Sequence, residues 1–355
     1  MVDERERLEA ESVGLAAGAE LPFEFRPGSR VSPLVVSFPH VGLEWPAELG
    51  PRPQVSFPRN ADYAVDRLYP RAEQLGAATI RARYSRLVVD LNRAGDDIGL
   101  EVVPDHPAPR PRASLGASIQ VGESRRKIRN RGVVWRTAVG GTPLFATLSY
   151  RDFHRRIERY HAPYHRALAK LLERRRQRFG YAILLDAHSM PGSVGGDLVL
   201  GTRGGRSCGE AVRELAIAAL DGRSLRTCNG RRGTWPLRLA VDDPYQGGEI
   251  VAALGQPQAQ IHAIQLEVSR ALYLDEYDLE LAPVPPPYTD GPARPRGRVA
   301  SGSRAAQARL ARRRLEALVD TIDHLVRELS RERPSLAEPG VDPESGSERG
   351  PLCAE

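Results

Sequence analysis

The chain has 355 residues, of which 41% are hydrophobic and 27% are charged, so it has enough apolar sequence for a sizeable core and no sign of overall disorder. Its net charge of +6 comes from basic and acidic residues spread along the whole chain, which argues against a nucleic-acid partner. No apolar run reaches the ~20 residues of a membrane span, and three cysteines without a Cys-x-x-Cys spacing predict neither a disulfide framework nor a thiolate zinc site.

The N-terminal residues 1–28 are charged and then punctuated by glycine and proline, a composition typical of a flexible lead-in. The opening sequence MVDERERLEAES lacks the basic segment and the apolar segment of a secretion signal. We therefore expect a cytoplasmic protein with no membrane partner.

Four apolar segments, each with polar residues at or near its end, predict strands that are buried on both faces of a sheet. The first segment, PLVVSFPH, ends at His40, and the second, YSRLVVDLNR, ends at Asn92 and Arg93. The third segment, YAILLDAHS, ends near His188, and the fourth, IHAIQLEVSR, carries Glu267 near its end. Helical patterns between these segments, at 62–74, 150–178 and 207–220, complete the prediction of an α/β fold. Pro70 is expected to limit the first helix, and Pro163 is expected to break the second.

The C-terminal part of the chain follows a catalytic domain expected at 29–282. Residues 283–302 are rich in proline, glycine and arginine and indicate a linker, and an amphipathic helix is expected at 303–333. Docking of this helix onto the domain is favoured over a homodimer seam, because two heptads are short for an autonomous coiled coil. Residues 334–355 are expected to form a disordered tail.

A metal site is predicted where the strands end, because sites in open α/β sheets lie beyond the carboxyl ends of the strands. His40 and Glu44 are four residues apart and can bind one cation together, although this spacing is common by chance and also fits a turn histidine and a solvated glutamate. His188 would complete the ligand set of a hydrolytic zinc site. Asp186, two residues earlier on the same side of the strand, is predicted to orient the His188 ring, with capping of the next turn as the alternative.

Four more residues are candidates for catalysis and substrate binding. Glu267 interrupts an apolar strand and is predicted to be a general base, with a salt bridge to an arginine as the alternative. Arg93, with Asn92 beside it, is predicted to hold a substrate carboxylate, although in an arginine-rich chain it also fits an ordinary surface residue. Tyr245, beside the two glycines of PYQGGEI, is predicted to line the site.

Two further motifs are assigned no chemistry. The loop GDLVLGTRGG lacks the Lys-Ser/Thr pair of a phosphate loop, which excludes nucleotide binding there. His161 and His165 flank Pro163 and are predicted to be packing and hydrogen-bonding residues.

Taken together, these segments resemble the N-formylglutamate amidohydrolase (N-formylglutamate deformylase) family. The matching stretches occur in the family's order over residues 31–282 and are FPHVGLEWP, DYAVDRLY, SRLVVDLNR, GVVWRTAVGGTPLF, RIERYHAPYHRAL, LLDAHSMPG, GDLVLGTRGGRSC, DDPYQGGEIV and QLEVSRALYLDE. The resemblance implies a three-layer α/β/α fold with a mixed, mainly parallel sheet, similar to zinc carboxypeptidases and succinylglutamate desuccinylases.

The resemblance also implies the roles of individual residues. It implies one zinc ion, with other divalent metals as alternatives, held by His40, Glu44 and His188. It implies Glu267 as the catalytic base, and it matches Asn92 and Arg93 to a carboxylate-binding Asn-Arg pair.

The chain departs from the family pattern in two places. The carboxypeptidase motif is His-x-x-Glu, whereas one more residue separates His40 from Glu44. Asp242 and Asp243 precede Pro244 where the family has an amide residue. An aspartate near a carboxylate substrate is expected to weaken binding or to change the preferred substrate.

We therefore expect a zinc-dependent amidohydrolase that acts on a small N-acyl amino acid, with N-formyl-L-glutamate as the favoured substrate. The first alternative is the same site acting on another N-acyl amino acid or on a peptide with a free carboxylate. The second is a metal-free binding protein with the same fold.

Overall fold

The structure is a computed structural model that describes residues 21–108, 132–194, 196–229, 231–275 and 304–337. The linker expected at 283–302 lies outside these residues, as do 1–20 of the expected lead-in and 338–355 of the expected tail. Among the described residues, no helix combines the length and the apolar character that crossing a membrane requires.

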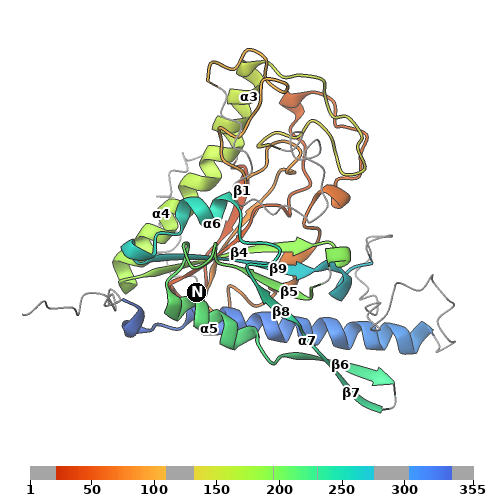
Figure 1. Cartoon of the computed structure of the whole chain (residues 1–355), viewed down its shortest axis with the longest axis vertical. Helices are drawn as coiled ribbons and strands as arrows, with labels where there is room; N and C mark the ends of the chain where they lie inside the picture. The colour runs from red at the N-terminus through yellow and green to blue at the C-terminus, as the bar shows by residue number, and fades with distance from the viewer. Residues whose placement is uncertain (1–20, 109–131, 195, 230, 276–303, 338–355) are drawn as a thin grey trace, which may run out of the picture.

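A seven-stranded sheet forms the centre of the molecule, in the order β1-β3-β2-β4-β9-β5-β8 (Figure 1). The pairs β3–β2, β2–β4, β4–β9 and β5–β8 are parallel, whereas β1–β3 and β9–β5 are antiparallel, so the sheet is mixed and mainly parallel as predicted. A separate hairpin, formed by β6 and β7, extends beside the C-terminal helix α7. The strands are β1 (Phe23–Arg26), β2 (Leu34–Phe38), β3 (Ala78–Ala82), β4 (Ala182–Met190), β5 (Leu198–Gly201), β6 (Ser224–Asn229), β7 (Arg231–Pro236), β8 (Leu239–Val241) and β9 (Ile261–Ser269).

Helices cover both faces of this sheet, which confirms the three-layer arrangement. The helices α4 (Ala162–Phe179) and α6 (Glu249–Leu254) pack on one face. The helix α3 (Tyr150–Arg156) and the π-helical turn η4 (Ile157–His161) lead into α4. The helices α5 (Glu210–Leu220) and α7 (Arg304–Ser330) pack on the other face. Strand side chains alternate between the two faces, so each face has its own hydrophobic cluster.

Three of the four predicted strands are confirmed as β2, β4 and β9. The strand predicted at the second apolar segment is wrong, because the chain at 84–93 forms turns and the neighbouring strand is β3. In these turns the Val88 N–H donates to the Ser85 carbonyl and the Arg93 N–H donates to the Asp90 carbonyl. The apolar side chains of this segment are buried all the same. A short apolar run therefore indicated burial here and not strand geometry.

The helix predicted at 62–74 is also wrong, because the structure has only a 3-10 turn at Val65–Leu68 followed by further turns. Ala64 has a left-handed backbone, with φ of 60°, which ends any helix that would start at Asp62. The 3-10 helices of the described chain are η1 (Ala47–Leu49), η2 (Pro58–Asn60), η3 (Val65–Leu68), η5 (Gly192–Val194), η6 (Pro257–Ala259), η7 (Arg270–Leu272) and η8 (Pro334–Leu336).

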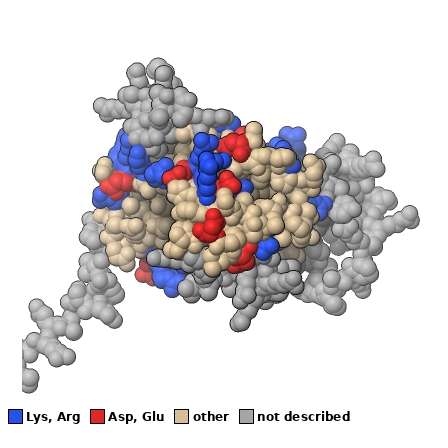
Figure 2. Space-filling view, turned by 90° about the horizontal axis from the view of Figure 1, so that it is seen from above, with Lys and Arg blue, Asp and Glu red and all other residues tan. Residues whose placement is uncertain are grey.

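Ordered structure extends into both expected terminal segments. β1 lies within the expected lead-in and pairs with β3, and its Phe23 side chain is buried. At the other end, η8 lies in the expected tail and buries Leu336. On the face drawn in Figure 2, acidic and basic side chains are interspersed, as the mixed charge of the sequence predicts.

The C-terminal helix α7 is docked onto its own domain. Its Leu318, Ile322, Leu325 and Leu329 side chains are fully buried in the hydrophobic cluster that also contains residues of α5 and the sheet. Arg71 reinforces this contact through ion pairs with Asp320 and Asp323 on the helix. The docking prediction is confirmed, and the apolar face that a homodimer seam would use is covered within the chain.

We expect Leu325→Ala to lower the free energy of unfolding by about 2–5 kcal/mol, because it leaves a cavity between α7 and the sheet. Arg312→Ala is the matched control, since this side chain is exposed on the same helix and its removal should cost at most about 0.5 kcal/mol. Urea unfolding followed by circular dichroism measures both. Equal effects of the two variants would contradict the docking of α7 in solution.

Candidate metal centre

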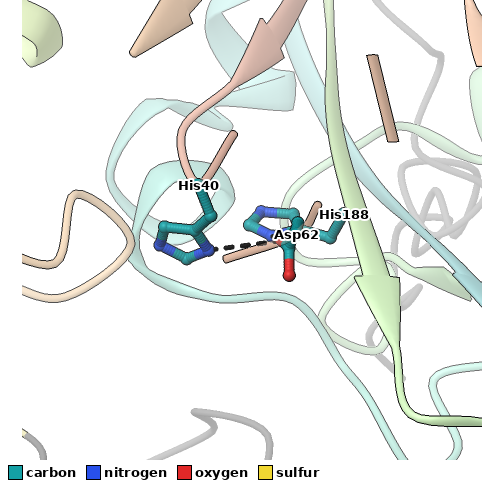
Figure 3. Close-up of side chains that lie close together, drawn as sticks. All are labelled: His40, Asp62 and His188. Carbon is teal, nitrogen blue, oxygen red and sulfur yellow. Dashed lines mark hydrogen bonds and ion pairs between the residues drawn. The ribbon is translucent and has the colours of Figure 1, made fainter. Parts of the chain in front are cut away.

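His40, Asp62 and His188 come together at the carboxyl edge of the sheet (Figure 3). His40 follows β2 by two residues, His188 lies within β4, and Asp62 comes from the loop before η3. Asp62 Oδ2 is 2.9 Å from His188 Nδ1 and 3.4 Å from His40 Nδ1. All three side chains are buried, and one donor atom of each lies within 4.8 Å of the others. This group could therefore hold one metal ion.

Each imidazole also contacts its own buried aspartate, through the ring nitrogen that does not face Asp62. Asp90 Oδ1 is 2.7 Å from His40 Nε2, and Asp186 Oδ2 is 2.7 Å from His188 Nε2. An ionised carboxylate can only accept a hydrogen bond, so both rings carry hydrogen on Nε2 and present Nδ1 to Asp62. This His-carboxylate pairing is the usual support of metal-binding histidines. Asp186 thus lies within hydrogen-bond distance of the His188 ring that it is predicted to orient.

The centre of this group attracts positive charge. With hydrogen on both Nε2 atoms, the Nδ1 lone pair of His188 faces the Asp62 carboxylate at 2.9 Å, and two such acceptors repel unless a proton or a cation lies between them. Burial alone would lower the pKa of His188, but Asp186 and Asp62 raise it well above its usual value. The Nδ1 atom of His40 is buried and has no hydrogen-bond partner among the described residues. Two nitrogen lone pairs and one carboxylate oxygen fit a cation such as zinc.

Asp62 is fixed by Arg270, which lies at the start of η7. The Arg270 Nη2 atom donates to Asp62 Oδ1 at 3.3 Å and to the Ala61 carbonyl at 2.9 Å, which leaves Oδ2 facing the imidazoles. Burial alone would raise the pKa of Asp62, but its interactions with His188 and His40 outweigh burial and hold the pKa well below its usual value. The carboxylate is therefore ionised, as a metal ligand must be.

Asp90 is the most fully bonded carboxylate of the centre. Besides His40, it accepts hydrogen bonds from Arg86 Nη2 at 2.5 Å, Trp135 Nε1 at 3.1 Å and the Asn92 N–H at 3.0 Å. The Arg86 guanidinium also lies over the Trp135 ring. Burial alone would raise the pKa of Asp90, but the charges of Arg86 and His40 lower it well below its usual value. Asp90 thus remains ionised as a rigid support for His40.

Glu44, the expected carboxylate ligand, lies outside this group, and Asp62 lies in its place. The chain after His40 is extended and not helical, because Glu44 pairs with Tyr84 in a short β-bridge. Its carboxylate is 51% exposed and forms an ion pair with Arg83 at 3.0 Å. Sequence reasoning missed Asp62 and Asp90. The signal for each was its place in a family-like stretch, DYAVDRLY for Asp62 and SRLVVDLNR for Asp90.

Glu267 lies on the same face of the sheet as His188, its register partner across the β4–β9 pair. The Glu267 side chain is buried, and Gln265 Nε2 donates to its Oε1 at 2.8 Å. No arginine forms an ion pair with Glu267 in the part of the chain that the structure describes. Burial raises the pKa of Glu267 to about 7, against the attraction of His188. A carboxyl group with this pKa is suited to proton transfer near neutral pH.

Asn92 links its own turn to α6 and β9 through its side-chain amide. Its Oδ1 accepts from the Ile250 N–H at 2.9 Å, and its Nδ2 donates to Gln265 Oε1 at 3.3 Å. Gln265 Oε1 also accepts from the Gly248 N–H at 2.8 Å, so its Nε2 must face Glu267. A Cβ atom at Gly248 would lie 2.3 Å from Asn92 Nδ2. The glycines of PYQGGEI therefore permit the close approach of Asn92.

Arg93 and Tyr245 lie near the centre, in different surroundings. Arg93 is on a turn and not at a strand end. Its guanidinium has no ion-pair or hydrogen-bond partner among the described residues, and its charge helps to lower the pKa of Asp90. Tyr245 is buried against Met190, the last residue of β4, and Val199. Among the described residues, Arg93 is thus an unpaired cation whose charge reaches the carboxylate that supports His40.

Asp242, one of the residues that depart from the family pattern, has a structural role. Its carboxylate accepts from the Thr202 N–H and the Thr202 hydroxyl, both at 2.6 Å, and from the Gly204 N–H at 3.1 Å. The Asp242 carboxylate therefore stabilises the loop after β5 through these hydrogen bonds.

Known proteins match most of this chain. The family model described as N-formylglutamate amidohydrolase matches residues 32–274. Proteins named N-formylglutamate deformylase from Pseudomonas aeruginosa and Pseudomonas putida are 33% and 32% identical over 259 residues, which is 69% of this chain and 83% and 82% of theirs. The crystal structure of N-formylglutamate amidohydrolase from Ralstonia eutropha JMP134 aligns with a TM-score of 0.62 and 25% identity, covering 86% of this chain and 99% of that one.

We expect Asp62→Ala to weaken zinc binding by more than the ~10–100-fold that follows the loss of a supporting hydrogen bond, because it removes a ligand. Glu44→Ala should leave the affinity unchanged. Competition of the metal-free protein with a chromophoric chelator measures both. Loss of zinc in Glu44→Ala together with full retention in Asp62→Ala would restore the His40–Glu44 pair as the ligand set.

Proposed function

This chain belongs to the N-formylglutamate amidohydrolase family, and on that premise we propose that it hydrolyses N-formyl-L-glutamate to formate and L-glutamate with the help of one bound metal ion. The observation that carries the proposal is the meeting of two imidazoles and one carboxylate beside Glu267, on one face of the sheet. This is the donor set of a hydrolytic metal site together with a base.

The proposed ligands are His40, Asp62 and His188, and the proposed metal is zinc, with other divalent metals as alternatives. Bound there, the ion would act as a Lewis acid that polarises the formyl carbonyl and makes the attacking water more acidic. Asp90 and Asp186 would keep the two imidazoles aimed at the ion. Glu44 is not part of this proposed ligand set.

Glu267 is the proposed general base and general acid. It takes a proton from water as the water oxygen attacks the formyl carbon, and it gives that proton to the amide nitrogen as the carbon–nitrogen bond breaks. The hydrogen bond from Gln265 occupies Oε1, so Oε2 is the atom that carries the proton. Formate and the free amine of glutamate are the products.

Arg93 is the proposed anchor for a carboxylate of the substrate. Its guanidinium is free of protein partners among the described residues and can bind a carboxylate through two parallel hydrogen bonds. Asn92 supports this site from behind, because its amide is already bonded to Ile250 and Gln265. Tyr245 is the proposed apolar wall. Since Asp242 is occupied by the loop after β5, we find no reason in that residue to favour a different acyl substrate.

Formate release from N-formyl-L-glutamate tests the substrate and the metal together. We expect the purified protein to release formate, a chelator to stop the release, and added zinc to restore it. A protein that retains one zinc ion but releases no formate would contradict the substrate. Release that continues unchanged after complete metal removal would contradict the metal.

Glu267→Gln tests the base. This nearly isosteric change removes the proton-accepting group, so we expect kcat to fall by at least ~100-fold while zinc content stays the same. The matched control is Glu210→Gln, an exposed acid at the start of α5, for which kcat should not change. An active Glu267→Gln enzyme would remove Glu267 from the proposed mechanism.

A further inference from the structure

His161 and His165 form a stacked pair behind the segment that carries Asn92 and Arg93. Their ring centroids are 4.3 Å apart and the ring planes differ by 18°. His161 ends the π-helical turn η4, and His165 lies one turn later in α4, after Pro163. π-helical turns within α-helices are rare and frequently accompany functional sites. Neither histidine belongs to the group around Asp62.

Both rings bind backbone carbonyls of the same short segment. His161 Nε2 is 2.8 Å from the Arg93 carbonyl oxygen, and His165 Nε2 is 2.8 Å from the Leu91 carbonyl oxygen. A carbonyl only accepts, so each Nε2 carries a hydrogen and donates it. Burial lowers the pKa of both histidines, so these rings are neutral donors near neutral pH.

The segment 91–93 depends on such contacts, because it lies in neither a helix nor a strand. The Asn92 carbonyl, between the two that the histidines bind, accepts from the Glu249 N–H at 3.4 Å on the opposite side. The Asn92 and Arg93 N–H groups both donate to Asp90. Three successive carbonyls are thus held alternately by α4, α6 and η4, which fixes the backbone from which the Arg93 side chain leaves.

We propose that His161 and His165 are positioning residues that aim the Arg93 guanidinium at a substrate carboxylate. The inference rests on the proposed function, since Arg93 is a substrate-binding residue only within it. A long, charged side chain on an irregular loop binds well only if its backbone is already ordered before the substrate arrives. The two imidazoles supply this order at both sides of Asn92.

The first test compares His161→Leu with His161→Gln. Leucine removes the donor, whereas glutamine places an N–H near the position of Nε2. We expect His161→Leu to raise KM for N-formyl-L-glutamate about 10-fold with kcat within about 3-fold, and His161→Gln to restore most of the affinity. His154→Gln is the matched control, because His154 is exposed on α3 and should change neither constant. If His161→Leu does not fold, His161→Asn replaces it, since asparagine is polar but too short to reach the carbonyl.

A double-mutant cycle with Arg93→Ala shows whether the histidine acts through Arg93. If it does, removing His161 should raise KM much less in the Arg93→Ala background than in the parent protein. Equal fold-changes in both backgrounds, or an unchanged KM in His161→Leu, would overturn the proposal. A loss in kcat alone would also overturn it, because that result points to the chemical step.

Amide hydrogen exchange separates this inference from the proposed function. If the parent protein releases no formate from N-formyl-L-glutamate, the proposed function fails by itself. The positioning role is then decided by the Asn92 and Arg93 amides, which should exchange at least ~10-fold faster in His161→Leu than in His161→Gln. Equal protection in the two variants would overturn the positioning role as well.

Discussion

The site depends on one electrostatic constraint, which is that the Nδ1 atoms of two imidazoles face one carboxylate oxygen in a buried region. His188 Nδ1 and Asp62 Oδ2 lie 2.9 Å apart, a contact that only a shared proton or cation makes favourable. The rings cannot turn away, because Asp90 and Asp186 hold their other nitrogens. The fold thus keeps three electron-pair donors aimed at one point before any cation binds.

Burying four carboxylates in one region is unfavourable unless cations or hydrogen-bond donors offset the loss of hydration. Each of the four carboxylates has different partners. Asp90 is offset by Arg86 and Trp135, and Asp62 by Arg270. Asp186 is held by the imidazole of His188. Glu267 has only an amide donor in Gln265, so burial raises its pKa toward neutrality. Glu267 forms no ion pair among the described residues and has a pKa near neutrality, which agrees with its proposed role in proton transfer.

The two layers of helices serve different purposes. α5 and α7 bury the apolar face of the sheet, and α7 adds ion pairs to Arg71 that fix its place. On the other face, η4, α4 and α6 supply hydrogen-bond donors to the irregular segment at 91–93. One face thus stabilises the sheet on which the site is built, and the other positions the loop that the proposed substrate would meet.

The sequence alone determined which strands form the centre and which strand residues face the site. Apolar runs identified β2, β4 and β9, and the two-residue period of a strand put Asp186 beside His188. The tertiary structure decided what the loops contribute. No characteristic sequence spacing connects His40 or His188 with Asp62, Asp90 and Arg270. Glu44 lies outside the group because its backbone pairs with Tyr84 in a short β-bridge. The physical reason is that strand periodicity is local, whereas the path of a turn follows from hydrogen bonds to residues far away in the chain.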